Sequence, residues 1–324
     1  MKVHQTDFSK GNVYRNIIEV SLPMTLAQLL NLLYNIVDRM YIGRIPGAGA
    51  TALTGVGICF PVITMIAAFT YLFGNGGSPL CAMELGRGNH EEAEKLMGNT
   101  FSMLLISSVI LMAVSYLFYK PILYAFGASD VTFPYAGDYI KIYLIGTPFV
   151  MISLGLNPFI NCQGFGNMGM MTVLIGAVLN IILDPFMISV LHMGAAGAAI
   201  ATTIGNIMAS VYYLWYFMKK SPNFSILPKY FSPENRLAFM ICSCGFPTAI
   251  FSVLMSLSTI ILNQILVAYG NAPVAAIGIV FKANMFITFL QMGLANGVQP
   301  LLGYNFGSGD TKRFRGVESY TKKC

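Results

Sequence analysis

Long runs of apolar residues recur along the whole chain, and short segments that hold most of its charged residues separate them. Each run approaches or exceeds the roughly 20 residues that an α-helix needs to cross a bilayer. The runs lie at about 15–43, 52–83, 96–118, 137–162, 169–191, 195–218, 237–268 and 274–304. They lack the polar and apolar alternation that marks the strands of a membrane barrel. The pattern predicts an all-α, polytopic membrane protein with about eight transmembrane helices.

Several of these runs are longer than a bilayer is thick, so tilted or kinked helices are expected. Pro23, Pro61, Pro148 and Pro158 fall inside the runs. Since proline interrupts the hydrogen-bond ladder of a helix, we expect kinks at these four positions.

Composition and charge support a membrane protein. Apolar residues make up 56% of the chain and charged residues 10%, whereas soluble domains have about 45–50% and about 25%. Most Lys and Arg fall in segments that are cytoplasmic if the N-terminus lies inside, as the positive-inside rule requires. The net charge of +6 is therefore divided among several loops, and we exclude nucleic acid as a partner. The N-terminus shows no cleavable signal peptide, so the first span is expected to direct insertion.

The six cysteines lie mostly in apolar surroundings and have no metal-ligand spacing. Cys242 and Cys244 form only a CxC inside an apolar run. We interpret the cysteines as small buried hydrophobic residues. The sequence predicts neither a dedicated metal site nor a cofactor.

An internal repeat relates the second and eighth apolar runs. Residues 56–95 align with residues 277–316 in one constant register, and the flanking segments SLPMTLAQLL and GFPTAIFSVL also correspond. The aligned pairs are Gly57 with Gly278, Phe60 with Phe281, Asn75 with Asn296, Gly76 with Gly297, Pro79 with Pro300, Gly86 with Gly307 and Gly88 with Gly309.

The two copies lie six spans apart, so they enter the membrane in the same direction. Parallel repeats of this kind are typical of two-lobed transporters whose substrate path runs between the lobes. We predict a complete six-helix lobe at 1–225 and a partial lobe of two helices and a basic tail at 226–324. A lobe with two of six helices cannot close its half of a cavity, so we expect the chain to be truncated.

Polar residues on the first span form a seam. Gln28, Asn31, Asn35 and Asp38 are spaced by three, four and three residues and share one face of a helix. The amides could line a cavity or could bond neighbouring helices together. Asp38 is ionisable, and such a group at membrane depth usually marks an ion or proton pathway.

A second acidic residue, Asp184, lies on the fifth span. Asn180 precedes it by one turn on the same face, and Pro185 follows it. Because proline crowds the carbonyl four residues back, it can free the oxygen of Ile181. Thr202, on the next span, could add a hydroxyl. These oxygen ligands suit a small alkali cation or a shared proton equally well.

Four segments carry a resemblance to a known family. They are SLPMTLAQLLNLLYNIVDRMYIGR, GNGGSPLCAMELGRGNHEEAEK, NPFINCQGFGNMGMMTVLIGAVLNIILDPFMI and MGAAGAAIATTIGN. In order and spacing they resemble the multidrug and toxic compound extrusion (MATE) family, in its prokaryotic branch. The resemblance implies twelve helices in two lobes, so this chain would end after about eight of twelve.

The resemblance also implies a function. The chain would be a secondary active multidrug efflux antiporter, and not an enzyme, exporting cationic or amphipathic drug-like compounds in exchange for H⁺ or Na⁺. It implies a multi-pass protein of the prokaryotic inner membrane with a cytoplasmic N-terminus, surrounded by lipid and monomeric at full length. The coupling site would comprise Asp38, Asn180, Asp184 and Thr202, which are also the residues where Na⁺ would bind.

Three alternatives remain from the sequence. An intramembrane aspartyl protease also needs two membrane aspartates, but neither YNIVD nor LNIILD contains its GxGD pattern. A lipid-linked-saccharide flippase of the same superfamily would show a more cationic cavity. The chain could also be a non-functional fragment of a transporter. Lys282, inside the eighth run, either extends toward the membrane surface or pairs with a carboxylate.

Overall fold

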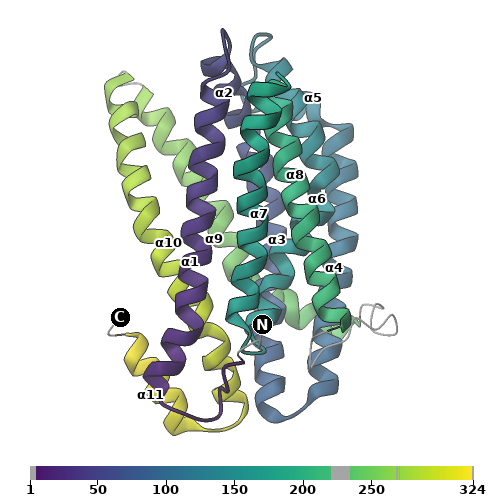
Figure 1. Cartoon of the computed structure of the whole chain (residues 1–324), viewed down its shortest axis with the longest axis vertical. Helices are drawn as coiled ribbons and strands as arrows, with labels where there is room; N and C mark the ends of the chain where they lie inside the picture. Colours follow the sequence, from purple (N-terminus) through teal and green to yellow (C-terminus); the bar gives the residue numbers. More distant parts are fainter. Residues whose placement is uncertain (1–4, 220–233, 268, 270, 323–324) are drawn as a thin grey trace.

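The computed structural model is an all-helical bundle in which long helices run side by side along the longest axis (Figure 1). It describes residues 5–219, 234–267, 269 and 271–322. Seven helices in this described part are long and apolar enough to cross a membrane. The predicted all-α, multi-pass class is therefore confirmed.

Each predicted run contains most of one long helix. The first six runs correspond to α1 (Val13–Gly43), α3 (Phe60–Arg87), α4 (His90–Leu117), α6 (Phe133–Asn161), α7 (Gly166–Pro185) and α8 (Gly194–Lys219). The last two correspond to α9 (Asn235–Val267) and α10 (Asn271–Gly307). Shorter elements are α2 (Gly49–Ile58), α5 (Tyr119–Ala125), a π-helical turn η1 (Phe186–Val190) and α11 (Thr311–Thr321).

The run at 52–83 is not one helix, and this part of the prediction is wrong. The chain turns at Cys59, between the end of α2 and the start of α3. Pro61 lies in the first turn of α3, where its missing N–H leaves no helical bond unmade. The helices that contain Pro23, Pro148 and Pro158 continue through them.

Helix α6 forms the centre of the bundle, because 67% of its most apolar window is buried and the other candidate spans reach at most 44%. It packs against α3, α4 and α8. The largest fully buried side chains around it include Phe159, Tyr213 and Tyr216. Small residues permit close packing nearby: a Cβ on Gly205 of α8 would lie 3.0 Å from the carbonyl oxygen of Gly176 on α7.

Helices α9 and α10 pack on α1 and α3. The chain before α1 runs along the end of the bundle that also carries α11 (Figure 1). There the N-terminal segment, α1, α10 and α11 share a small core of Phe8, Ile17, Val20, Val298, Leu301 and Val317. The division into lobes at 225 and 226 stays a prediction.

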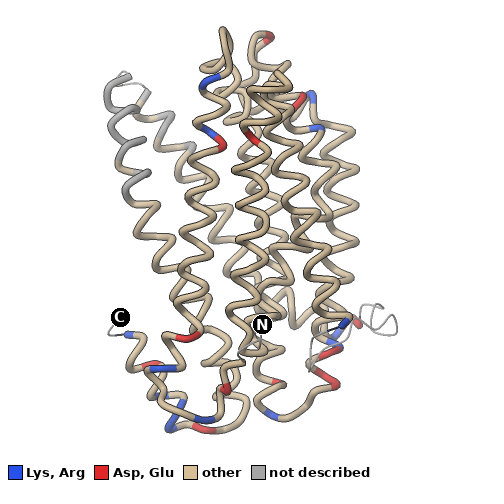
Figure 2. Tube along the Cα trace, viewed as in Figure 1, with Lys and Arg blue, Asp and Glu red and all other residues tan. Residues whose placement is uncertain are grey.

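Charged residues gather toward the two ends of the bundle, and the middle of the described helices carries almost none (Figure 2). This distribution is expected where the middle of the bundle lies in hydrocarbon, since charges there are costly. Which end faces the cytoplasm stays a prediction.

Candidate functional site

Asp184 and Asn180 lie one turn apart on α7 and are enclosed by neighbouring helices. Asp184 is 0% exposed and Asn180 is 2% exposed. Helix α7 packs on both α1 and α8, and this packing places the two side chains away from lipid. A buried carboxylate needs partners, because lipid and apolar side chains offer it none.

The Asn180 amide joins Asp184 to α8. Oriented with its nitrogen toward the carboxylate, Asn180 donates to Asp184 Oδ2 at 2.8 Å, and its oxygen accepts from the Thr202 hydroxyl at 3.0 Å. The structure thus brings together three of the four predicted site residues. Their arrangement is a chain of oxygen-bearing groups that crosses from one helix to the next.

One oxygen of the Asp184 carboxylate remains available. Among the described residues, Asp184 Oδ1 and Asp38 Oδ1 are both buried without a hydrogen-bond partner. The two carboxylates lie on α1 and α7, which pack against one another. Carboxylates that lie close together in a low-dielectric region favour a cation or a proton between or upon them.

Helix α7 changes its winding directly after this site. Pro185 has no N–H to donate, and the next residues form the π-helical turn Phe186–Val190. Such turns leave backbone groups less regularly paired than in an α-helix, and they occur frequently at functional sites. The release of the Ile181 carbonyl oxygen by Pro185 stays a prediction.

The seam on α1 behaves differently from the α7 site. Gln28, Asn31, Asn35 and Asp38 are all half-buried. Asn35 Nδ2 donates to the carbonyl oxygen of Asn31 at 2.7 Å, so this amide bonds its own helix. No hydrogen bond in the described part connects the three amides to Asp184, and their role stays a prediction.

A second network of polar side chains supports α8 from the side of α6. Asn206 Nδ2 donates to the Thr202 carbonyl at 2.8 Å, and the Ser153 hydroxyl donates to Asn206 Oδ1 at 2.9 Å. Ser153 therefore reaches Thr202 through a single residue. Sequence reasoning missed Ser153, although its position in the apolar run of α6 was a signal.

Sequence reasoning also missed a buried cluster further along α6. Asn157 Nδ2 donates to the Gly169 carbonyl at 3.0 Å and lies within hydrogen-bond distance of the hydroxyls of Thr172 and Tyr213, which also contact one another. Asn161 Nδ2 donates to Asn157 Oδ1 at 3.0 Å. The spacing of Asn157 and Asn161 by one turn could have identified a polar face of α6, although not its partners on α7 and α8.

The described residues contain no group of three or more His, Cys, Asp or Glu that could hold a metal ion. The donors at the α7 site are a carboxylate, an amide and a hydroxyl. Oxygen ligands suit hard cations, so this set fits a transported or coupling ion such as Na⁺, or a proton. The side chain of Lys282 lies outside the described residues.

A sequence profile of the family MatE matches residues 23–186 and 247–321. The multidrug export protein MepA of Staphylococcus haemolyticus (strain JCSC1435) is 30% identical over 305 residues, which cover 94% of this chain and 67% of that protein. MepA of Staphylococcus aureus (strain MRSA252) is 30% identical over 301 residues, which cover 93% of this chain and 66% of that protein. The chain thus spans about two thirds of the length of these relatives.

Solved structures show the same fold. A crystal structure of MATE in complex with MaD3S has a TM-score of 0.92 at 24% identity, covering 100% of this chain and 72% of that one. A MOP superfamily transporter from Pyrococcus furiosus Vc1, whose reverse polarity of binding pocket suggests a different function, has a TM-score of 0.91 at 24% identity, covering 100% and 71%. The likeness of fold alone therefore does not distinguish one function from another.

Proposed function

Because this chain belongs to the MatE family and is a membrane transporter, not an enzyme, we propose that it exports drug-like organic cations and amphipathic compounds by antiport with H⁺ or Na⁺. The observation that carries the proposal is the buried Asp184, which is bonded through Asn180 to Thr202 and has one oxygen without a partner in the described part. Its acidic character suits exchange of a cation better than recognition of an anionic lipid-linked saccharide.

The coupling follows from charge. When the ion site is empty, the negative charges of Asp38 and Asp184 repel one another across the contact between α1 and α7. A bound proton or Na⁺ removes that repulsion and favours a different packing of the two helices. If the two packings differ in affinity for the exported compound, each ligand reduces the affinity for the other, and exchange follows from linkage.

Transport into vesicles tests this proposal. The purified full chain is reconstituted with a pH-sensitive dye or a Na⁺-sensitive dye inside, and ethidium is added as the transported cation. We expect ethidium to evoke a flux of one of the two ions, and we expect Asp184→Asn to reduce that flux at least about tenfold because the ion loses its charged ligand.

Asp130→Asn is the matched control, because Asp130 is an exposed carboxylate that accepts a hydrogen bond from the Tyr124 hydroxyl at 3.1 Å. It should leave the flux unchanged. Unaltered ion flux in Asp184→Asn would contradict the assignment of the site. Absence of any ethidium-evoked flux in the unmodified chain would contradict the antiport itself.

A further inference from the structure

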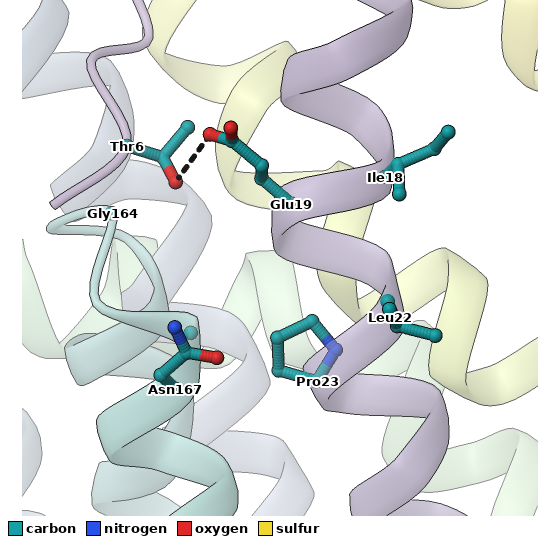
Figure 3. A pocket seen from close by; sticks show the side chains of 8 residues that line it. Thr6, Ile18, Glu19, Leu22, Pro23, Gly164 and Asn167 are labelled. Atoms are coloured by element: carbon teal, nitrogen blue, oxygen red, sulfur yellow. Dashed lines mark hydrogen bonds between the residues drawn. The ribbon is translucent and has the colours of Figure 1, made fainter. Parts of the chain in front are cut away.

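A separate cavity of about 320 Å³ opens between α1, α7 and the N-terminal segment. It lies at the opposite end of α1 from Asp38, against the first turns of that helix. Figure 3 shows Glu19 and Pro23 on α1 and Asn167 on α7 extending into the space between the two helices, with Thr6 of the N-terminal segment beside Glu19.

Glu19 is the only ionisable side chain among the residues that line this cavity. Its side chain is 26% exposed, and its Oε1 accepts from Arg15 Nε at 2.8 Å. Its Oε2 accepts a longer bond from the Thr6 hydroxyl, at 3.3 Å. The carboxylate is thus accessible from the cavity and is held by two partners that can be replaced.

The Arg15 contact is easy to exchange. The Arg15 side chain is 75% exposed, and ion pairs at such exposed positions contribute only about 0–1 kcal/mol. A ligand cation that reaches Glu19 from the cavity therefore competes with a solvated arginine rather than with a buried pair. The Glu19 carboxylate can therefore exchange Arg15 for a ligand cation at little cost.

Apolar side chains complete the cavity on the side of α1. Ile18 and Leu22 lie one turn apart and are 42% and 55% exposed, and Pro23 also lines the cavity. In a helix of the membrane boundary, such exposed aliphatic side chains face acyl chains. A molecule in the leaflet can therefore place its apolar body on these residues while its polar end reaches Glu19.

We propose that this cavity binds an organic ammonium ion with an apolar body, taken up from the adjoining membrane leaflet, with Glu19 as the counter-ion. As an access site for exported cations it rests on the proposed function. The same chemistry also fits the amine headgroup of phosphatidylethanolamine. Binding displaces the Arg15 and Thr6 side chains from Glu19, while the Thr6 N–H keeps its 2.9 Å bond to the Gly164 carbonyl and holds the N-terminal segment in place.

Protection of a cysteine at position 22 tests the site without relying on transport. The full-chain variant Leu22→Cys is placed in nanodiscs of phosphatidylglycerol, which has no amine, and a thiol reagent is added. Labelling at residue 22 is then quantified by mass spectrometry, so the native cysteines do not interfere. We expect ethidium to slow this labelling at least about fivefold, because the bound cation covers the apolar side chains beside Glu19.

The added change Glu19→Gln should abolish the protection, because the amide keeps the shape of the side chain and the bond from Thr6 but carries no charge. Glu318→Gln is the matched control, since Glu318 also forms an i,i+4 ion pair, with Lys322, but lies on α11 away from the cavity. It should leave the protection intact. Protection that persists in Glu19→Gln, or that never occurs, overturns the proposal.

Two further experiments distinguish a lipid headgroup from a drug-like cation as the ligand, and the cavity proposal from the proposed coupling site. If nanodiscs that contain phosphatidylethanolamine slow labelling without ethidium, and Glu19→Gln restores it, the resident ligand is the lipid headgroup. If ethidium alone protects, the site takes drug-like cations. Protection that remains in Asp184→Asn supports a cavity independent of the coupling site, so it stands even if ethidium-evoked ion flux is not observed.

Discussion

Gly86 on α3 lies directly against the carbonyl oxygen of Tyr304 on α10: a Cβ at Gly86 would be 2.1 Å from that oxygen. Gly307 on α10 meets the carbonyl oxygen of Met83 on α3 in the same manner, at 2.0 Å. In the register of the internal repeat, Gly86 corresponds to Gly307 and Met83 to Tyr304. The two helices therefore cross through equivalent contacts on either side of the crossing point.

This contact predicts that Gly86→Ala destabilises the protein, because the methyl group would force two backbones apart. We expect a loss of about 1–3 kcal/mol, as for other overpacked interiors, and a lower midpoint of thermal unfolding in detergent. Gly57→Ala is the control, since nothing lies within 4 Å of a Cβ at Gly57. An equal midpoint for both variants would show that α3 and α10 do not approach as closely as described.

We expect substitutions of Thr202 to lower the affinity for the coupling ion according to whether they keep the hydroxyl. Thr202→Val keeps the shape of the side chain but removes the donor to Asn180 at 3.0 Å, leaving a buried amide oxygen with one partner fewer at a cost of about 1–3 kcal/mol. The concentration of coupling ion that gives half-maximal flux in vesicles should rise by about five- to a hundredfold. Thr202→Ser, which restores the hydroxyl, should recover most of the affinity; equal effects of both changes would exclude a role for this bond.

The bonds of Arg313 lead to a prediction about amide hydrogen exchange in the N-terminal segment. Its guanidinium donates to the carbonyl oxygens of Phe8, Lys10 and Gly11 at 2.8, 2.6 and 2.9 Å. Arg313→Lys keeps the charge but cannot form this planar set of bonds. Hydrogen exchange of residues 5–12 should then accelerate at least about threefold, whereas Arg315→Lys, an exposed change on the same helix, should not affect it. Unchanged exchange in Arg313→Lys would mean that other contacts hold the segment.

Asp7 predicts a pH dependence of the same segment. Hydrogen bonds from the Ser9 hydroxyl at 2.6 Å and the Ser9 N–H at 2.9 Å lower the pKa of Asp7 below its ordinary value of 3.8. Because the folded pKa is the lower one, the carboxylate stabilises the folded segment above pH 3.8, and this contribution is lost as the pH falls through the folded pKa. Ser9→Ala should raise the pKa of Asp7 in an NMR titration; no change would show that the hydroxyl bond does not form.

The sequence predicts the long helices well because their signal is continuous. Between 166 and 190 most residues are apolar, and α7 with its π-helical turn occupies that range. The break at Cys59 was not predicted, since the residues around Pro61 are as apolar as those within a span. Hydropathy reports burial in lipid, not the local interruption of a helix.

Part of the candidate site could be predicted from the sequence, and part could not. Asn180 and Asp184 share a face by spacing alone, so the sequence predicts their proximity. That Ser153 supports Asn206, and that Asn157 meets Tyr213, depends on how α6 packs against α8, which no pattern within one helix encodes. No pattern in the sequence singles out Glu19, and only the folding of Thr6 and Asn167 around it defines a cavity.

The bonds between Arg313 and the carbonyl of Phe8 join residues 305 positions apart, and this separation constrains biogenesis. During translation residues 5–12 emerge among the first, yet their guanidinium partner is synthesised only after every long helix of the described chain. Until then the N-terminal residues are held by α1, through Asn16 and Glu19, and by the α6–α7 turn, through Gln163 and Gly164. The bonds between Arg313 and the N-terminal segment therefore form late, after α11 has been synthesised.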